Sequence, residues 1–166
     1  METGLKLHTI YKVEVLEGHT KADVDKLAQV ILKNSHKRLS DNQADSRFED
    51  SYCPDHPIVD QIIGEILETI KQSVGAELKL KEKWGLVHQP NMSTNQHRHG
   101  DTAISSVVYL KVPEKCGHLV FVHDEVRTSF GPPIKGSFLL FPGGLEHFVT
   151  RNLSKEPRVS LSLNFN

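Results

Sequence analysis

Three side chains that can bind a metal ion, His97, His99 and Asp101, occupy alternate positions in the segment NQHRHGDTAIS. The chain contains 10 histidines, and only here do two lie two residues apart with a carboxylate two further on. In an extended strand, residues i and i+2 point to the same face, so these side chains are expected to converge. Two imidazoles and one carboxylate form the facial triad of non-haem Fe(II) oxygenases, which leaves coordination positions open for other ligands.

A triad of this kind needs a second histidine from a distant part of the chain. His147 is the best candidate, because it ends the stretch GSFLLFPGGLEH, in which an apolar strand and a glycine-rich turn lead into the next strand. We therefore predict that His99, Asp101 and His147 bind one metal ion.

The last strand, RVSLSLNF, alternates polar and apolar residues from Arg158 to Phe165. Its apolar face is predicted to be buried, whereas its polar face either meets water or lines an interior cavity. Arg158 and Ser160 share that polar face. A guanidinium beside a hydroxyl suits a carboxylate ligand, because arginine can hold a carboxylate through two parallel hydrogen bonds.

The order of these features resembles the Fe(II)- and 2-oxoglutarate-dependent oxygenases, whose pattern is H-x-D, a distal histidine and then a basic residue, here in an R-x-S form. The strand ISSVVYLKVP is similar to the strand that follows H-x-D in prolyl hydroxylases, and closer still to that of small oxygenases from bacteria and their phages. The resemblance covers residues 84 to 166. It implies a double-stranded β-helix, a jelly-roll or cupin-like barrel that holds iron and the cosubstrate inside its mouth.

The resemblance also implies a ligand set for the metal. Carried over residue by residue, the ligands are His99, Asp101 and His147. The small subgroup centres on H-x-H in this stretch, so His97 is the alternative to Asp101 as the third ligand.

For the cosubstrate, the resemblance implies that Arg158, assisted by Ser160 and Tyr109, binds the far carboxylate of 2-oxoglutarate. The implied reaction is hydroxylation of a substrate C–H bond by O2, with release of succinate and CO2 and with ascorbate as a possible reductant. Similarity to the prolyl hydroxylase strand favours a peptide or protein substrate, with proline as the first candidate and a small metabolite as the second.

A cupin-type metalloprotein on the same barrel is the main alternative. The stretch GSFLLFPGGLEHFVTRN nearly fits the second cupin motif, but Arg151 stands where that motif has asparagine. The first cupin motif fits less well, since no glutamate follows His97 and His99 at the required offset. A non-catalytic metal- or sugar-binding β-domain is a further alternative.

Length, charge and cysteine content indicate the number of domains, the kinds of partner and the location of the protein. A chain of 166 residues suits a single domain. Its 20 basic and 21 acidic residues nearly cancel, which predicts no nucleic-acid partner and no attraction to a membrane surface. The two cysteines form no CxxC pair, so we expect free thiols and a cytoplasmic location. The sequence leaves the oligomeric state open.

The elements that must position these residues fall into two parts. Residues 1–83 are expected to supply a strand and supporting helices, and residues 84–166 the β-rich core, in a mainly β fold with N-terminal helices (α+β). Thr20 and Asp23 form a capping box for the first helix. The N-terminal part is expected to contain a strand over 5–16, helices over 21–34 and 57–73, and a loop over 35–55.

Overall fold

A computed structural model describes residues 13–35 and 53–166. The strand expected over 5–16 and the loop expected over 35–55 fall mostly outside the described residues. The described elements, in chain order, are β1 (Leu16–His19), α1 (Val24–Asn34), α2 (Pro57–Val74), β2 (Leu80–His88), β3 (Thr94–His97), β4 (Ile104–Lys111), β5 (Leu119–His123), β6 (Val126–Phe130), β7 (Ser137–Pro142), β8 (Glu146–Val149) and β9 (Arg158–Phe165).

The strands form two antiparallel sheets, as expected for a double-stranded β-helix. One has five strands in the order β1-β7-β4-β9-β2, and the other has four in the order β3-β8-β5-β6. Except for the hairpin of β5 and β6, neighbouring strands in each sheet are not consecutive in the sequence, so crossovers connect them. The prediction of a mainly β fold with two helices is confirmed. The sequence patterns missed the short strands β3 and β6.

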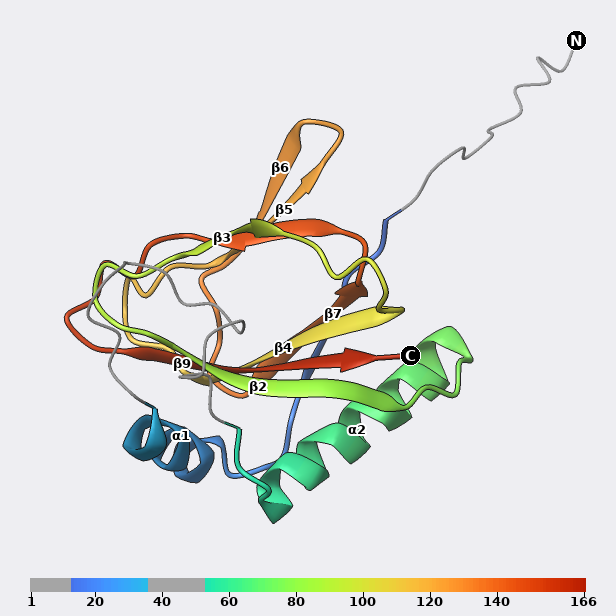
Figure 1. The fold of residues 1–166 in the computed structure, drawn as a ribbon, viewed down its shortest axis with the longest axis horizontal. Helices are drawn as coiled ribbons and strands as arrows, with labels where there is room; N and C mark the ends of the chain where they lie inside the picture. The colour runs from blue at the N-terminus through green and yellow to red at the C-terminus, as the bar shows by residue number, and fades with distance from the viewer. Residues whose placement is uncertain (1–12, 36–52) are drawn as a thin grey trace, which may run out of the picture.

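Both helices lie on the outer side of the five-stranded sheet (Figure 1). Their apolar stripes, which include Ile31, Ile62 and Ile66, pack against the apolar face of β9, whose Leu161 and Leu163 are fully buried. This packing fixes the direction of the opposite face of β9. Because side chains alternate along a strand, Arg158, Ser160, Ser162 and Asn164 all face the space between the two sheets.

The helix ends follow from local chemistry, with one correction to the sequence analysis. The N-cap of α1 is Asp23, whose carboxylate accepts a hydrogen bond from the Lys26 amide at 3.1 Å. Thr20 does not cap the helix, because its hydroxyl donates to Glu65 at 2.6 Å and so ties the segment before α1 to α2. Gly75 ends α2 in the left-handed conformation.

No helix among the described residues is both long and apolar enough to cross a membrane.

We expect Ile66→Ala to destabilise the fold by about 2–5 kcal/mol, because Ile66 is fully buried between α2 and the sheet and its truncation leaves a cavity. Urea unfolding measures the change. Val74→Ala in the same helix is the control: Val74 is 54% exposed, so its loss should change the stability by less than about 0.5 kcal/mol. Equal effects of the two substitutions would contradict the proposed packing of α2.

Candidate metal centre

Three histidines meet between the two sheets. His97, His99 and His147 each offer one ring nitrogen, and these atoms all lie within 4.8 Å of one another. His97 stands opposite His147 in the register of β3 and β8, with ring centroids 4.3 Å apart. His99 lies just beyond the end of β3, and its ring centroid is 5.3 Å from that of His147. The cluster therefore unites two neighbouring strands and the loop that follows one of them.

The loop that carries His99 is held by the glycine-rich turn before β8. The His99 amide donates to the Gly143 carbonyl at 2.8 Å, and the Gly143 amide donates to the Ala103 carbonyl at 3.2 Å. A Cβ at position 143 would lie 2.2 Å from the Thr102 carbonyl oxygen. Only glycine permits this close approach, which explains the role of the PGG sequence.

The protonation of the cluster suits a metal ion. Burial lowers the pKa of His147 to about 3, and burial also lowers the pKa of His99, so both rings are neutral at pH 7. His147 Nδ1 lies 2.8 Å from the Leu145 carbonyl oxygen, and His97 Nδ1 lies 2.7 Å from the Asn95 carbonyl oxygen. A carbonyl only accepts, so each Nδ1 carries a proton, and Nε2 is the ring nitrogen that can bind a metal.

Asp101 stands apart from the three histidines. Its carboxylate pairs with Lys81 at 2.5 Å, and its side chain is 85% exposed. The i, i+2 alternation does not extend to Asp101 because β3 ends at His97 and the chain turns, with the Thr102 amide donating to the His99 carbonyl. The structure thus brings His97 to the cluster and turns Asp101 outward, toward β2.

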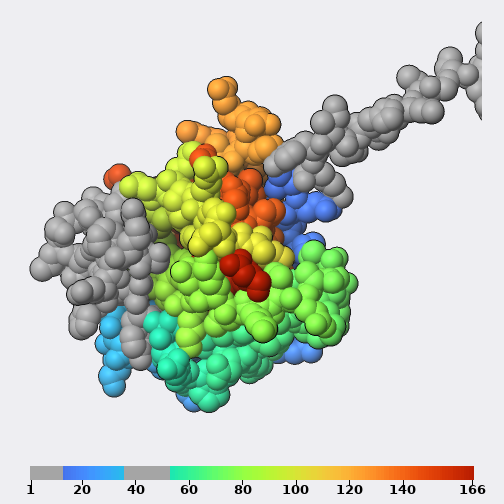
Figure 2. Space-filling view, turned by 45° about the vertical axis from the view of Figure 1, so that its right-hand side comes forward, coloured from blue at the N-terminus to red at the C-terminus, as the bar shows by residue number. Residues whose placement is uncertain are grey.

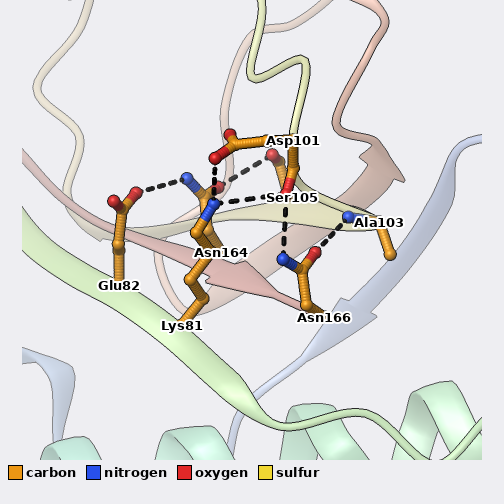
Figure 3. A network of polar contacts seen from close by, with 7 residues as sticks. All are labelled: Lys81, Glu82, Asp101, Ala103, Ser105, Asn164 and Asn166. Carbon is orange, nitrogen blue, oxygen red and sulfur yellow. Dashed lines mark hydrogen bonds and ion pairs between the residues drawn. The ribbon is translucent and has the colours of Figure 1, made fainter.

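A polar network holds that outward position (Figure 3). Lys81 and Asn166 both donate to the Asp101 carbonyl oxygen, at 3.2 and 2.8 Å. Asn166 also accepts from the Ala103 amide at 2.7 Å. The end of β9 and the start of β2 therefore clamp the loop after His99, and Figure 2 shows the last residues, in dark red, at the surface between the green and yellow segments.

The same network continues into the interior. Ser105 donates to Asn164 at 2.8 Å, and Asn164 donates to Glu82 at 3.1 Å (Figure 3). Ser105 and Asn164 are almost fully buried and line the space between the sheets. Their hydrogen bonds fix the ends of β4, β9 and β2 relative to one another beside the histidines.

A cavity of about 340 Å³ adjoins the cluster. The three histidines line it, and so do Arg158 and Ser160 from the polar face of β9. The polar face of the last strand therefore lines an interior cavity, which decides between the two readings that the sequence left open.

Arg158 is the most unusual residue of the cavity. It is fully buried, and none of its three guanidinium nitrogens has a hydrogen-bond partner. The guanidinium carbon lies 5.2 Å from the centroid of the Tyr109 ring. Burial lowers the pKa of Arg158, as expected for a charge that is removed from water without a counter-charge. A buried, unpaired cation is costly, so this geometry indicates a site for an anion.

Two other polar residues line the cavity or contact Arg158. Ser160, next but one along β9, is buried, and the Tyr109 hydroxyl is buried without a partner. Burial raises the pKa of Tyr109 to about 12, so the hydroxyl remains a donor. The structure thus places Tyr109 and Ser160 beside Arg158.

His88 is a cavity residue that the sequence analysis missed. It stands opposite Arg158 in the register of β2 and β9, is fully buried, and has an Nδ1 without a partner. Its Nε2 lies 2.8 Å from the Thr94 hydroxyl. The alternation of Trp84, Leu86 and His88 marks one face of β2, but only the register shows that this face meets Arg158.

Comparison with known proteins shows the fold. No family model matches the sequence, and no curated protein matches it. Among solved structures, a Pseudomonas putida prolyl-4-hydroxylase superimposes with a TM-score of 0.67 at 17% identity, over 92% of each chain. The viral collagen prolyl hydroxylase of Paramecium bursaria Chlorella virus-1, as a 2-oxoglutarate complex, gives 0.64 at 14% identity over 91% of this chain and 94% of that one.

A third match is the non-haem α-ketoglutarate-dependent epimerase SnoN from nogalamycin biosynthesis, with a TM-score of 0.69 at 16% identity over 92% of this chain and 77% of that one. Two further matches are longer proteins. This chain spans 60% of the length of an oxidoreductase of the 2OG-Fe(II) oxygenase family from Burkholderia pseudomallei and 59% of the length of the carbocyclase SnoK. The chain therefore has the double-stranded β-helix fold of the 2-oxoglutarate–Fe(II) oxygenases, as its motifs led us to expect.

The arrangement predicts which residues hold a metal. His97→Ala or His147→Ala should weaken Mn(II) or Fe(II) binding by more than the roughly 10- to 100-fold that the loss of an outer-shell partner costs. Asp101→Asn should change the affinity by less than about tenfold, because that carboxylate faces Lys81. Anaerobic titration of the metal-free protein measures the affinities. Loss of binding in Asp101→Asn with retention in His97→Ala would reverse the assignment.

The neutral state of His147 also predicts how the stability of the metal-free protein depends on pH. The unfolded chain binds a proton to this residue near pH 6.5, whereas the folded protein does so only near pH 3, so stability falls as the pH drops through this window. At pH 5 the loss from His147 is about 2 kcal/mol. In urea unfolding at pH 7 and pH 5, His147→Gln should remove about this much of the difference. An unchanged pH dependence would show that His147 is not buried as a neutral ring.

Proposed function

We propose that the protein is an Fe(II)- and 2-oxoglutarate-dependent dioxygenase that hydroxylates a substrate C–H bond. The observation that carries the proposal is the presence, in one cavity, of three converging histidines and a fully buried arginine without a partner. A dicarboxylate in this cavity would give Arg158 the counter-charge that it lacks and would offer its other end to a metal held by the histidines. The fold shared with the oxygenases supports the same reading.

The metal ligands in this proposal are His97, His99 and His147. Neutral imidazole is a common ligand of iron, and the two Nδ1 hydrogen bonds to backbone carbonyls hold the rings in the tautomer that binds a metal. Asp101 has its own partner in Lys81. His97, the alternative ligand, therefore takes the place that the family pattern gives to the aspartate.

The cosubstrate site in this proposal is built around Arg158. Its guanidinium would hold the far carboxylate of 2-oxoglutarate through two parallel hydrogen bonds. Ser160, Tyr109 and His88 would complete the shell as donors. For His88 this requires a proton on Nδ1, and the Thr94 hydroxyl can then donate to Nε2.

When bound, iron and 2-oxoglutarate supply the activation of O2, with release of succinate and CO2. The chain contributes geometry and a dry environment. The Phe141 ring packs edge-on against His147, with centroids 4.9 Å apart, and Phe121 packs against Phe141. These rings fix the orientation of His147 and keep water away from one side of the cluster.

The alternatives, a cupin-type metalloprotein or a non-catalytic metal-binding β-domain, give no role to Arg158. Either would need only the histidines. The buried guanidinium without a partner would then destabilise the protein and contribute nothing to ligand binding. Iron-dependent formation of succinate distinguishes an oxygenase from both.

The substrate class is a separate proposal. A peptidyl proline is the first candidate from the similarity of the VVYLKVP strand to prolyl hydroxylases, and a small metabolite is the second. Incubation with Fe(II), 2-oxoglutarate and ascorbate, with proline peptides, free amino acids and methylated oligonucleotides offered in parallel, compares them. We expect succinate formation to be coupled to oxygen incorporation in the peptide or the small molecule, and not in the oligonucleotide.

Arg158→Gln should weaken 2-oxoglutarate binding by roughly tenfold or more, because charge-assisted hydrogen bonds contribute about 1.5–3 kcal/mol. The fold should persist, since the substitution removes a buried charge that has no partner. Calorimetry on the Mn(II)-loaded protein measures the affinity, and Arg151→Gln, at an exposed position, is the matched control. Unaltered 2-oxoglutarate affinity in Arg158→Gln would contradict the proposal and favour the cupin alternative.

A further inference from the structure

Some cavity residues near the histidines have no role in the proposed cosubstrate site. They include Trp84, Asn95 and Arg98. Along the whole cavity, the lining that the structure describes contains two arginines and four histidines but no aspartate or glutamate. A ligand that enters here meets donors and positive charge.

Arg98 provides a free cation next to the histidines. It lies between His97 and His99, it lines the cavity, and it is exposed. Two lysines of β2 are already paired, Lys81 with Asp101 and Lys83 with Asp55. Within residues 13–35 and 53–166, by contrast, the guanidinium of Arg98 has neither a hydrogen-bond nor an ion-pair partner.

Trp84 is a second, independent sign of a ligand. Its indole Nε1 is buried without a hydrogen-bond partner, and the residue lines the cavity beside His99, with ring centroids 5.7 Å apart. A buried N–H group that lacks an acceptor destabilises the protein, because it has lost its hydrogen bonds to water. An acceptor atom of a ligand bound next to His99 would remove this cost.

The charges of the site point to a negative ligand. Three neutral imidazoles bring no charge, so the charges of a divalent metal and a 2-oxoglutarate dianion cancel and that of Arg158 remains. If an aspartate replaced one of the three histidines, the summed charge of the ligands, the metal, 2-oxoglutarate and Arg158 would be zero. An excess positive charge in a buried site is unfavourable, and a ligand with one negative charge offsets it.

We propose that the primary substrate is a small molecule with a carboxylate, which Arg98 binds at the mouth of the cavity while Trp84 donates a hydrogen bond. The inference rests on the proposed function and, from the charges of the cavity, favours the second candidate substrate class, a small metabolite, over the peptidyl proline that the strand similarity ranks first. The cavity, at about 340 Å³, is near the small end of ligand sites and must also hold the cosubstrate. A carboxylate matches the planar fork of arginine, which can hold it through two parallel hydrogen bonds.

The test uses the full chain loaded with Zn(II) and 2-oxoglutarate, so that binding is measured without turnover. The probes are matched pairs, free amino acids and three- to six-carbon carboxylic acids against their amides, with L-proline and L-prolinamide as one pair. Thermal shift followed by calorimetry should find at least one acid that binds tenfold or more tightly than its amide. Arg98→Gln should abolish that difference and leave the affinity for 2-oxoglutarate unchanged.

Arg151→Gln makes the same change of charge outside the cavity and should keep the preference for the acid. The inference is wrong if no acid binds more tightly than its amide, if Arg98→Gln retains the preference, or if inorganic phosphate or O-phosphoserine binds more tightly than every carboxylate. A protein that binds Zn(II) but not 2-oxoglutarate would instead refute the proposed function, and the substrate inference with it.

Discussion

The unpaired guanidinium of Arg158 is the constraint on which the rest of the structure depends. A fully buried cation without a partner is tolerated only if the surrounding fold holds it firmly and a ligand later compensates it. The fold meets the first condition through β9, which lies between β2 and β4 in the five-stranded sheet. The apolar face of β9 is fixed against both helices, so its polar face cannot turn to water.

The histidine cluster lines the same cavity as Arg158 and comes from the other sheet. β3 and β8 pair so that His97 stands opposite His147, and the cavity lies between these strands and β9. In the proposed function, one ligand with two ends would occupy both parts of this cavity. The geometry of two sheets facing each other thus creates one site from residues that are far apart in the sequence.

Asp101 shows how a short polar network can redirect a motif. The aspartate follows His99 at the family spacing, but the clamp formed by Lys81 and Asn166 holds it at the surface. The cluster is left without a carboxylate, so the cavity keeps a net positive character from end to end. The interior hydrogen bonds of Asn164 with Ser105 and Glu82 make this arrangement part of the packing between strands rather than a feature of one loop.

Much of the architecture was determined by the sequence itself. The 3.6-residue periodicity of the two helices and the strict alternation of β9 depend on neighbours along the chain, so local patterns predict them. The order of H-x-D, the distal His147 and Arg158-x-Ser160 pointed to the fold. The short strands β3 and β6 were missed because β3 is polar and β6 is mostly exposed, so neither has the apolar pattern that marked the equally short β5 and β8.

Only the tertiary structure decided which side chains meet. The i, i+2 rule holds within a strand, and it failed at Asp101 because β3 ends at His97 and a turn follows. His88 had no recognisable signal, since its meeting with Arg158 depends on the register of β2 against β9. Register and strand ends are set by packing between distant segments, which a single sequence does not display.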